Sequence, residues 1–102
     1  MKKLRIAVIG CGRIFSVYES AFGRLAHEME LVLAMDKDMS RAEAASAGHP
    51  GCIASDRIGI MEFKNTLNQV KPDLIHILLP HFLHGRYGMA AMECGVHVLT
   101  EK

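Results

Sequence analysis

The sequence predicts an α/β fold in which a doubly wound parallel sheet of about five strands carries helices on both faces. Short apolar runs alternate along the chain with segments in which apolar residues recur every three or four positions, the spacing of an amphipathic helix. The runs are apolar throughout, so the predicted strands are buried on both faces, as in a parallel sheet between two helical layers. At 102 residues, half of them apolar, the chain has the length for one domain over residues 1–102.

Two strand-and-helix units are expected in the first half of the chain. The run "LRIAVIG" at residues 4–10 predicts the first strand, and apolar residues at helical spacing over 14–25 predict the helix that follows it. The run "LVLAMD" at 31–36 predicts the second strand. An alanine-rich helix is expected over about 39–47, and Gly48 can terminate it because glycine readily adopts the left-handed backbone of a helix end.

In the third unit the sequence pattern of the strand is weak and that of the helix is strong. A short strand is expected near residues 52–54, and apolar residues at helical spacing over 60–70 predict an amphipathic helix. Ser55 or Asp56 is expected as the N-cap of that helix, because both side chains can accept a hydrogen bond from a free N–H group. The run "LIHILL" at 74–79 then predicts the fourth strand.

The last unit closes the predicted sheet. A helix is expected over 83–94 with Gly95 at its end, and "VHVL" at 96–99 predicts the fifth strand. For this alternation we expect the strand order 3-2-1-4-5, which places the fifth strand at an edge. Because a bare edge strand invites pairing, we expect the isolated domain to self-associate or to be marginally stable. We also expect the protein to be a homo-oligomer.

Charge and cysteine content exclude several classes of protein. Twelve basic residues against eleven acidic ones give a net charge of +1, without the basic excess that attracts nucleic acid or an anionic membrane. Cys11, Cys52 and Cys94 are odd in number and form no C-x-x-C pair, which favours a reducing compartment over a disulfide framework or zinc site. The apolar run at 6–9 is too short for a secretion signal, and no run approaches the roughly 18 residues of a membrane span. We therefore expect a cytoplasmic protein with neither nucleic acid nor membrane as a partner.

The first predicted strand runs into "IGCGRIF", which predicts a dinucleotide-binding loop of the Rossmann kind. Gly10 allows the tight turn, and Gly12 lets the main chain approach a pyrophosphate at the N-terminus of the next helix, where free N–H groups favour negative charge. Phe15 stands where this fingerprint has Gly or Ala. The alternative is that the two glycines only shape a turn, but the order of strand, turn and helix favours binding.

Asp36 ends the second predicted strand, where an acidic residue of this fold accepts hydrogen bonds from the adenosine ribose. Its carboxylate would repel a 2′-phosphate, so NAD is favoured over NADP as the cofactor. Lys37 and Arg41 lie nearby in sequence and soften that preference. The alternative is that Asp36 or Asp38 caps the following helix; Asp38 is the better placed of the two for capping.

The segments "IAVIGCGRI" and "PDLIHILLPHFLHGRYGMAAMECGVHVLTEK" together resemble the N-terminal domain of the Gfo/Idh/MocA oxidoreductases, over essentially the whole chain. The later half carries the most specific part of that pattern, which is a strand, a proline, a histidine four residues on, a helix ending in Ala-Gly or similar, then "HV" and "EKP". The residues that match are Pro80, His84, Gly95, His97, Val98, Glu101 and Lys102, and the sequence stops before the final proline.

The resemblance implies an NAD-dependent oxidoreductase that transfers hydride between a nicotinamide cofactor and a sugar, inositol or related polyol. In that family the Rossmann domain holds the cofactor, and a C-terminal domain, absent from these 102 residues, forms most of the substrate pocket. The resemblance makes Lys102 catalytic, since an ammonium can hydrogen-bond the substrate hydroxyl and stabilise a developing alkoxide. Without the resemblance, Lys102 would be taken as a solvated terminal lysine. With Gly10, Gly12 and Asp36 from the motifs above, the residues expected to bind the cofactor are Gly10, Gly12, Arg13, Ile14, Asp36, Leu79, Pro80, His84, Glu101 and Lys102.

Histidines and methionines in the later half admit simpler interpretations. His81 and His84 lie one helical turn apart, but no carboxylate or cysteine joins them at ligand spacing, so no metal site is expected. In the family, the loop from Leu79 to His84 lies along the nicotinamide ribose. His76 and His97, in predicted strands, are expected to be core or structural. The methionines Met61, Met89 and Met92 are expected to fill the core.

One function of another class remains open. The chain could be a free-standing nucleotide-binding or interaction domain without catalytic activity, which Phe15 and the missing second domain would both fit. The extent of the resemblance favours the cofactor domain of an oxidoreductase.

Overall fold

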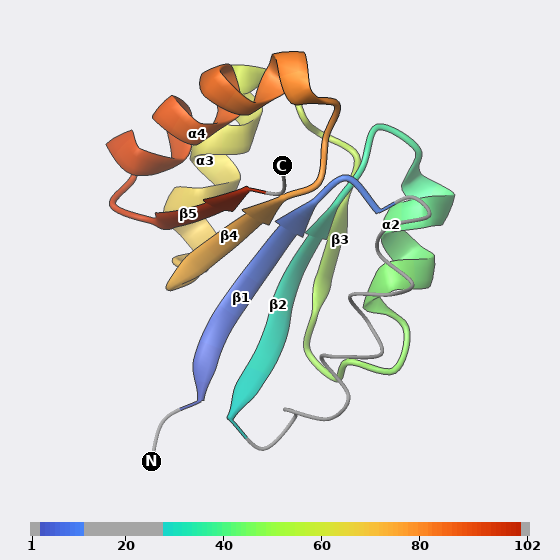
Figure 1. Ribbon diagram of the computed structural model, residues 1–102. Helices are drawn as coiled ribbons and strands as arrows, with labels where there is room; N and C mark the ends of the chain where they lie inside the picture. The colour runs from blue at the N-terminus through green and yellow to red at the C-terminus, as the bar shows by residue number, and fades with distance from the viewer. Residues whose placement is uncertain (1–2, 12–27, 101–102) are drawn as a thin grey trace.

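The computed structural model describes residues 3–11 and 28–100, so the helix expected over 14–25 lies outside the described residues. Within the described part, strands and helices alternate in the predicted order (Figure 1). The strands are β1 (Leu4–Ile9), β2 (Met29–Met35), β3 (Ile53–Ser55), β4 (Leu74–Ile77) and β5 (His97–Thr100). The helices are α2 (Met39–Ser46), α3 (Ile60–Val70), the short 3-10 helix η1 (His81–Leu83) and α4 (His84–Glu93).

The described strands form one five-stranded parallel sheet in the order β3-β2-β1-β4-β5, with β1 in the middle (Figure 1). This confirms both the predicted fold and the predicted strand order. At its carboxyl end, β1 aligns Ile9 with Met35 of β2 on one side and with Ile77 of β4 on the other. The loops that follow these three strands therefore meet at one edge of the sheet. There the strand order reverses, which is where ligands bind in open α/β sheets.

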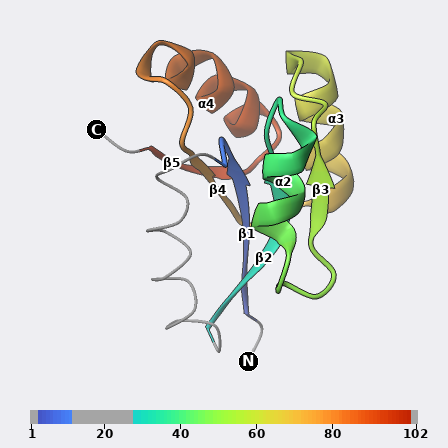
Figure 2. The ribbon, with the colours of Figure 1, turned by 90° about the vertical axis from the view of Figure 1, so that its right-hand side faces the viewer.

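Apolar side chains cover both faces of the sheet, as the unbroken apolar runs predict. Ala7 and Ile9 of β1 belong to the cluster that contains the buried residues of α3 and α4. Ile6 and Val8 belong to a second cluster, to which α2 contributes Ala45. Successive residues of a strand point to opposite faces, so β1 is buried from both sides. Figure 1 shows α3 and α4 next to each other in one helical layer, and Figure 2, seen from the right-hand side of Figure 1, shows α2 in front.

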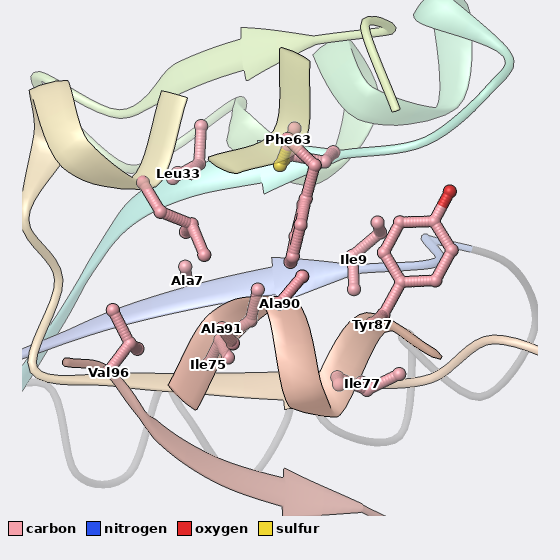
Figure 3. Packing of buried hydrophobic residues seen from close by; sticks show 12 residues of the cluster. Ala7, Ile9, Leu33, Phe63, Ile75, Ile77, Tyr87, Ala90, Ala91 and Val96 are labelled. Atoms are coloured by element: carbon pink, nitrogen blue, oxygen red, sulfur yellow. The ribbon is translucent and has the colours of Figure 1, made fainter. Parts of the chain in front are cut away.

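An aromatic pair joins the two helices of that layer. Phe63 of α3 is fully buried, and its ring meets Tyr87 of α4 edge to face, with centroids 4.9 Å apart and ring planes at 82° (Figure 3). Such a pair contributes about 0.5–1.5 kcal/mol beyond the area that it buries. The Tyr87 hydroxyl donates a hydrogen bond to the carbonyl of Ile58. The pair therefore also fixes the loop between β3 and α3, to which Ile58 belongs.

The predicted cap of α3 was wrong. The N-cap is Gly59, without a side-chain hydrogen bond, rather than Ser55 or Asp56. Ser55 is the last residue of β3, and its hydroxyl accepts a hydrogen bond of 3.2 Å from the N–H of Arg57. Helical spacing of apolar residues does not reveal how long the chain stays irregular before the helix starts.

The prediction that Met61, Met89 and Met92 fill the core was also wrong. Their exposed fractions are 70%, 63% and 61%. On α3 the inward positions are taken by Phe63 and Leu67, which are buried completely or almost so. The apolar stripe on each helix is therefore narrower than the sequence suggests, and the methionines lie outside it.

The two strand histidines differ in their surroundings. His76 of β4 is 2% exposed, as expected for a core position. His97 begins β5 and is exposed, so the expectation that it lies in the core was wrong. In the described sheet β4 has neighbours on both sides, whereas β5 is an edge strand with one neighbour.

Candidate functional site

A cavity of about 340 Å³ opens at the carboxyl edge of the sheet. Four loops line it: those that follow β1, β2, β3 and β4. The volume falls within the roughly 300–1,000 Å³ typical of small-ligand pockets. The lining residues are Gly10, Asp36, Lys37, Arg41, Ile58, Leu78, Leu79, Pro80, Phe82 and Leu83. Four predicted site residues, Gly10, Asp36, Leu79 and Pro80, thus lie on one cavity.

Gly10 lies where β1 ends and the chain turns. Its φ of +95° is a conformation that side chains other than glycine rarely adopt. A Cβ at this position would lie 2.9 Å from the carbonyl carbon of Leu78 and 3.1 Å from the amide nitrogen of Leu79. The Gly10 N–H also donates a 2.8 Å hydrogen bond to the carbonyl of Met35. The meeting of three main-chain segments therefore requires glycine here, independently of any ligand.

Asp36 follows β2 and is only 5% exposed. One carboxylate oxygen accepts a hydrogen bond of 2.7 Å from the N–H of Cys11, and the other accepts one of 2.8 Å from the N–H of Asp38. Asp36 therefore ties the loop after β1 to the start of α2. A carboxylate has about four lone-pair positions, so two remain for hydroxyl groups of a ligand in the cavity.

Asp38, rather than Asp36, caps α2. Its side chain accepts hydrogen bonds from the Ser40 N–H at 3.0 Å and from the Ser40 hydroxyl at 2.6 Å. The hydroxyl hydrogen bond is the main reason that the pKa of Asp38 is lowered, and Arg41 contributes less. Asp36 is therefore not the cap of α2, and it lines the cavity instead.

Cys11 is the residue between the two glycines, and sequence reasoning gave it no role in the site. Its thiol donates a 3.3 Å hydrogen bond to the carbonyl of Met35, and its N–H binds Asp36. Burial, and then the negative charge of Asp36, raise the pKa of the Cys11 thiol to about 12. The thiol therefore stays neutral at ordinary pH and is not a nucleophile.

The loop after β4 forms the second wall of the cavity. Leu79 and Pro80 line the cavity directly, whereas His84 does not. Nε2 of His84 lies 2.6 Å from the carbonyl oxygen of Leu79, so this ring nitrogen carries the proton and donates. His84 therefore acts on the cavity through Leu79, by holding the loop in place.

Two lining residues, Ile58 and Leu78, were missed by sequence reasoning. Leu78 follows β4 directly, and Ile58 lies three residues after the end of β3. The signal that could have found them is this position just beyond a buried parallel strand, since such residues reach the carboxyl edge of the sheet.

Five of the predicted site residues lie outside the described part of the chain. The structure therefore gives no geometry for the pyrophosphate loop or for the lysine assigned to catalysis. The five residues outside the described part are Gly12, Arg13, Ile14, Glu101 and Lys102.

A larger hollow of about 590 Å³ lies at the opposite, amino end of the sheet, lined mainly by charged side chains of both signs. There the Arg5 guanidinium already donates to the carbonyl of Lys71 at 2.7 Å, and the Arg5 N–H donates to the carboxylate of Asp73 at 2.8 Å. Because ligands of open α/β sheets bind at the carboxyl edge, the smaller cavity is the better candidate.

Residues 3–11 and 28–100 contain no group of three or more His, Cys, Asp or Glu residues that could hold a metal ion. The rings of His81 and His84 have centroids 5.2 Å apart. None of the helices described is both long and apolar enough to cross a membrane. The three cysteines, all in the described part, form no disulfide.

Comparison with known proteins matches this architecture to one family. The model of an oxidoreductase family with an NAD-binding Rossmann fold matches residues 4–102. The chain is 29% identical to D-glucoside 3-dehydrogenase of Escherichia coli (strain K12), over 97% of this chain and 27% of the relative. It is 31% identical to an inositol 2-dehydrogenase of Arthrobacter sp. (strain FB24), over 97% of this chain and 28% of the relative.

Solved structures show the same likeness. The WlbA dehydrogenase from Chromobacterium violaceum, in complex with NADH and UDP-GlcNAcA, is 29% identical to this chain with a TM-score of 0.87. The match covers 100% of this chain and 28% of the solved one. The chain thus spans little more than a quarter of the length of these proteins.

Proposed function

Because the chain belongs to the Gfo/Idh/MocA oxidoreductase family, with its NAD-binding Rossmann fold, we propose that it is the cofactor-binding part of a dehydrogenase. The substrate class is a sugar, an inositol or a related polyol. The observation that carries the proposal is that Gly10 and Asp36 line one cavity at the carboxyl edge of the sheet. Two relatives, named for a glucoside and for inositol, support the substrate class. When bound, NAD would supply the nicotinamide ring that accepts or returns the hydride.

The cofactor binds with its adenosine in the described cavity. The two remaining acceptor positions of Asp36 take hydrogen bonds from the ribose hydroxyls. A 2′-phosphate would bring negative charge next to a carboxylate that is already buried, which favours NAD over NADP. Lys37 and Arg41 line the same cavity and make this preference smaller.

The remaining cofactor contacts follow the family pattern. The loop of Gly12, Arg13 and Ile14 binds the pyrophosphate at the N-terminus of the next helix. The loop from Leu79 to His84, with Pro80 in it, lines the adenosine cavity and continues from there toward the nicotinamide ribose. That the hydrogen bond of His84 fixes Leu79 supports this part of the assignment.

Catalysis is assigned to Lys102, and Glu101 beside it to the cofactor. The ammonium of Lys102 donates a hydrogen bond to the substrate hydroxyl, and its charge stabilises the alkoxide that develops as hydride leaves the adjacent carbon. The substrate pocket and any partner acid or base lie outside these 102 residues, since the relatives are more than three times as long. We infer a cytoplasmic homo-oligomer that binds no nucleic acid, and the small net charge of +1 supports the last point.

The test separates binding from chemistry. The 102-residue chain should bind NADH without turning over any polyol, whereas a chain of the relatives' length that carries this sequence should reduce NAD with a polyol substrate. In that longer chain, Lys102→Ala should leave NAD affinity nearly unchanged and lower kcat by about 100-fold or more. Lys102→Arg should rescue poorly, because a planar guanidinium does not replace a compact ammonium.

The matched control is Lys3→Ala, at the opposite end of the sheet, which should change neither quantity. Normal turnover by Lys102→Ala would overturn the catalytic assignment. Binding without turnover in the longer chain would favour the other hypothesis, a nucleotide-binding domain without catalytic activity.

A further inference from the structure

Phe82 is the most exposed of the large apolar side chains in the described part, at 82%, and it lines the candidate cavity. We propose that Phe82 is a specificity-determining residue, which stacks on the adenine base of the cofactor. This assignment rests on the proposed use of the cavity for NAD. It goes further by naming the side chain that recognises the base.

The turn that carries Phe82 is held in place from both sides. The N–H of Leu83 donates to the carbonyl of Pro80 at 2.9 Å, and His84 donates through Nε2 to the carbonyl of Leu79 at 2.6 Å. Leu79 and Leu83 also pack against the larger apolar cluster. Phe82, between them, is therefore presented from a fixed turn, so binding needs little further ordering of the main chain.

The polar and the apolar residues that line the cavity come from different segments, and a nucleoside requires such a separation. The polar lining residues Asp36, Lys37 and Arg41 all come from the segment after β2. The lining residues from the loops after β3 and β4 are all apolar: Ile58, Leu78, Leu79, Pro80, Phe82 and Leu83. A ligand that places hydroxyls against Asp36 and a flat apolar face against Phe82 matches this division, and a purine nucleoside has both features.

Stacking on an exposed aromatic ring also explains why the ring is kept out of the core. A base stacked on an aromatic side chain contributes roughly 1–3 kcal/mol, judged by alanine substitution, which corresponds to about ten- to hundred-fold in affinity. The neighbouring Leu83 packs into the cluster instead, so the turn has an inward apolar position that Phe82 does not take.

Fluorescence tests the stacking directly, because the sequence contains no tryptophan. Phe82→Trp places a single fluorophore at the proposed contact, and ADP should quench it with a saturable dependence on concentration. NMN, which carries no adenine, should leave the emission unchanged. Quenching by NMN as strong as that by ADP, or none by ADP, would overturn the proposal.

Calorimetry with ADP provides a second and independent measurement. Phe82→Ala should weaken ADP binding about ten- to hundred-fold, and Phe82→Leu should recover only part of the loss, because it restores apolar area without an aromatic face. Met89→Ala removes another exposed apolar side chain, away from the cavity, and should leave the Kd for ADP unchanged.

The outcomes distinguish a failure of the proposed cofactor pocket from a failure of the role given to Phe82. If the unmutated chain bound no ADP, the proposed cofactor pocket would fail. If ADP bound to Phe82→Ala as tightly as to the unmutated chain, only the role of Phe82 would fail. Unchanged ADP affinity together with a shift from dimer to monomer in sedimentation would make Phe82 a contact between two copies and would overturn the proposal.

Discussion

Replacing Gly10 by alanine tests how tightly the candidate site is built into the fold. The backbone at Gly10 has a φ of +95°, and an added Cβ would lie 2.9 Å from both the carbonyl carbon and the carbonyl oxygen of Leu78. Both obstacles are main-chain atoms that follow β4, so neither can move aside as a flexible side chain would. The loops after β1 and β4 must therefore separate, or β1 must shift.

The expected cost is the sum of two contributions. Holding an L-residue in a left-handed conformation costs about 1–2 kcal/mol. Forcing an extra carbon into a close-packed contact costs about 1–3 kcal/mol more. Gly10→Ala should therefore lower the free energy of unfolding by about 2–5 kcal/mol, a large part of the roughly 5–15 kcal/mol that stabilises a typical domain.

The chain provides a matched control for the first contribution alone. Gly48 has a φ of +83°, but an added Cβ there would meet nothing within 4 Å. Gly48→Ala should therefore cost only the conformational part, about 1–2 kcal/mol. Urea unfolding followed by circular dichroism would compare the two variants with the unmutated chain. Equal losses for Gly10→Ala and Gly48→Ala would refute the close approach of Gly10 to the main chain of Leu78.

Two further predictions concern the walls of the site. Tyr87→Phe removes the hydrogen bond to the carbonyl of Ile58 and should lower the free energy of unfolding by about 0.5–1.5 kcal/mol in urea denaturation, so an unchanged value would contradict this contact. Burial and the charge of Asp36 raise the pKa of the Cys11 thiol to about 12 in the folded chain. In an unfolded chain the pKa of a cysteine thiol is about 8.5. The contribution of Cys11 to stability is thus complete below about pH 8.5 and is lost as the pH rises toward about 12. The urea midpoint of the unmutated chain should fall more between about pH 7.5 and about pH 10 than that of Cys11→Ala, and parallel falls would contradict the buried neutral thiol.

Most of the fold was predictable because unbroken apolar runs have few alternatives. Strands such as β1 and β4, in which every residue but one is apolar, are stable only between two helical layers, and that condition leads to a parallel sheet. The strand order then places the ends of β1 and β2 at one edge, so the meeting of Gly10 and Asp36 followed from the order of the elements. These two residues were predictable because each stands directly at the end of a strand.

The parts that were not predictable depend on a few degrees of rotation or on single hydrogen bonds. Whether Met61 or Met89 lies inside the apolar stripe of its helix depends on how that helix is rotated against the sheet, which the spacing does not specify. The bond from the N–H of Cys11 to Asp36 involves the main chain, so no residue type signals it. Likewise, nothing in "PHFLH" shows that His84 turns back to Leu79 whereas Phe82 faces the cavity.

Calorimetric titration of the 102-residue chain with NADH and with NADPH tests the central claim most directly. If the cavity of Gly10 and Asp36 holds the adenosine of NAD, the chain should bind NADH more tightly than NADPH. Asp36→Ala should narrow that difference, because it removes the carboxylate that accepts from the ribose and repels a 2′-phosphate. The two hydrogen bonds to Asp36 also support the fold, so circular dichroism must first show that the variant retains its structure. Equal affinities of the unmutated chain for the two cofactors, or a preference left unchanged in a folded Asp36→Ala, would contradict the account.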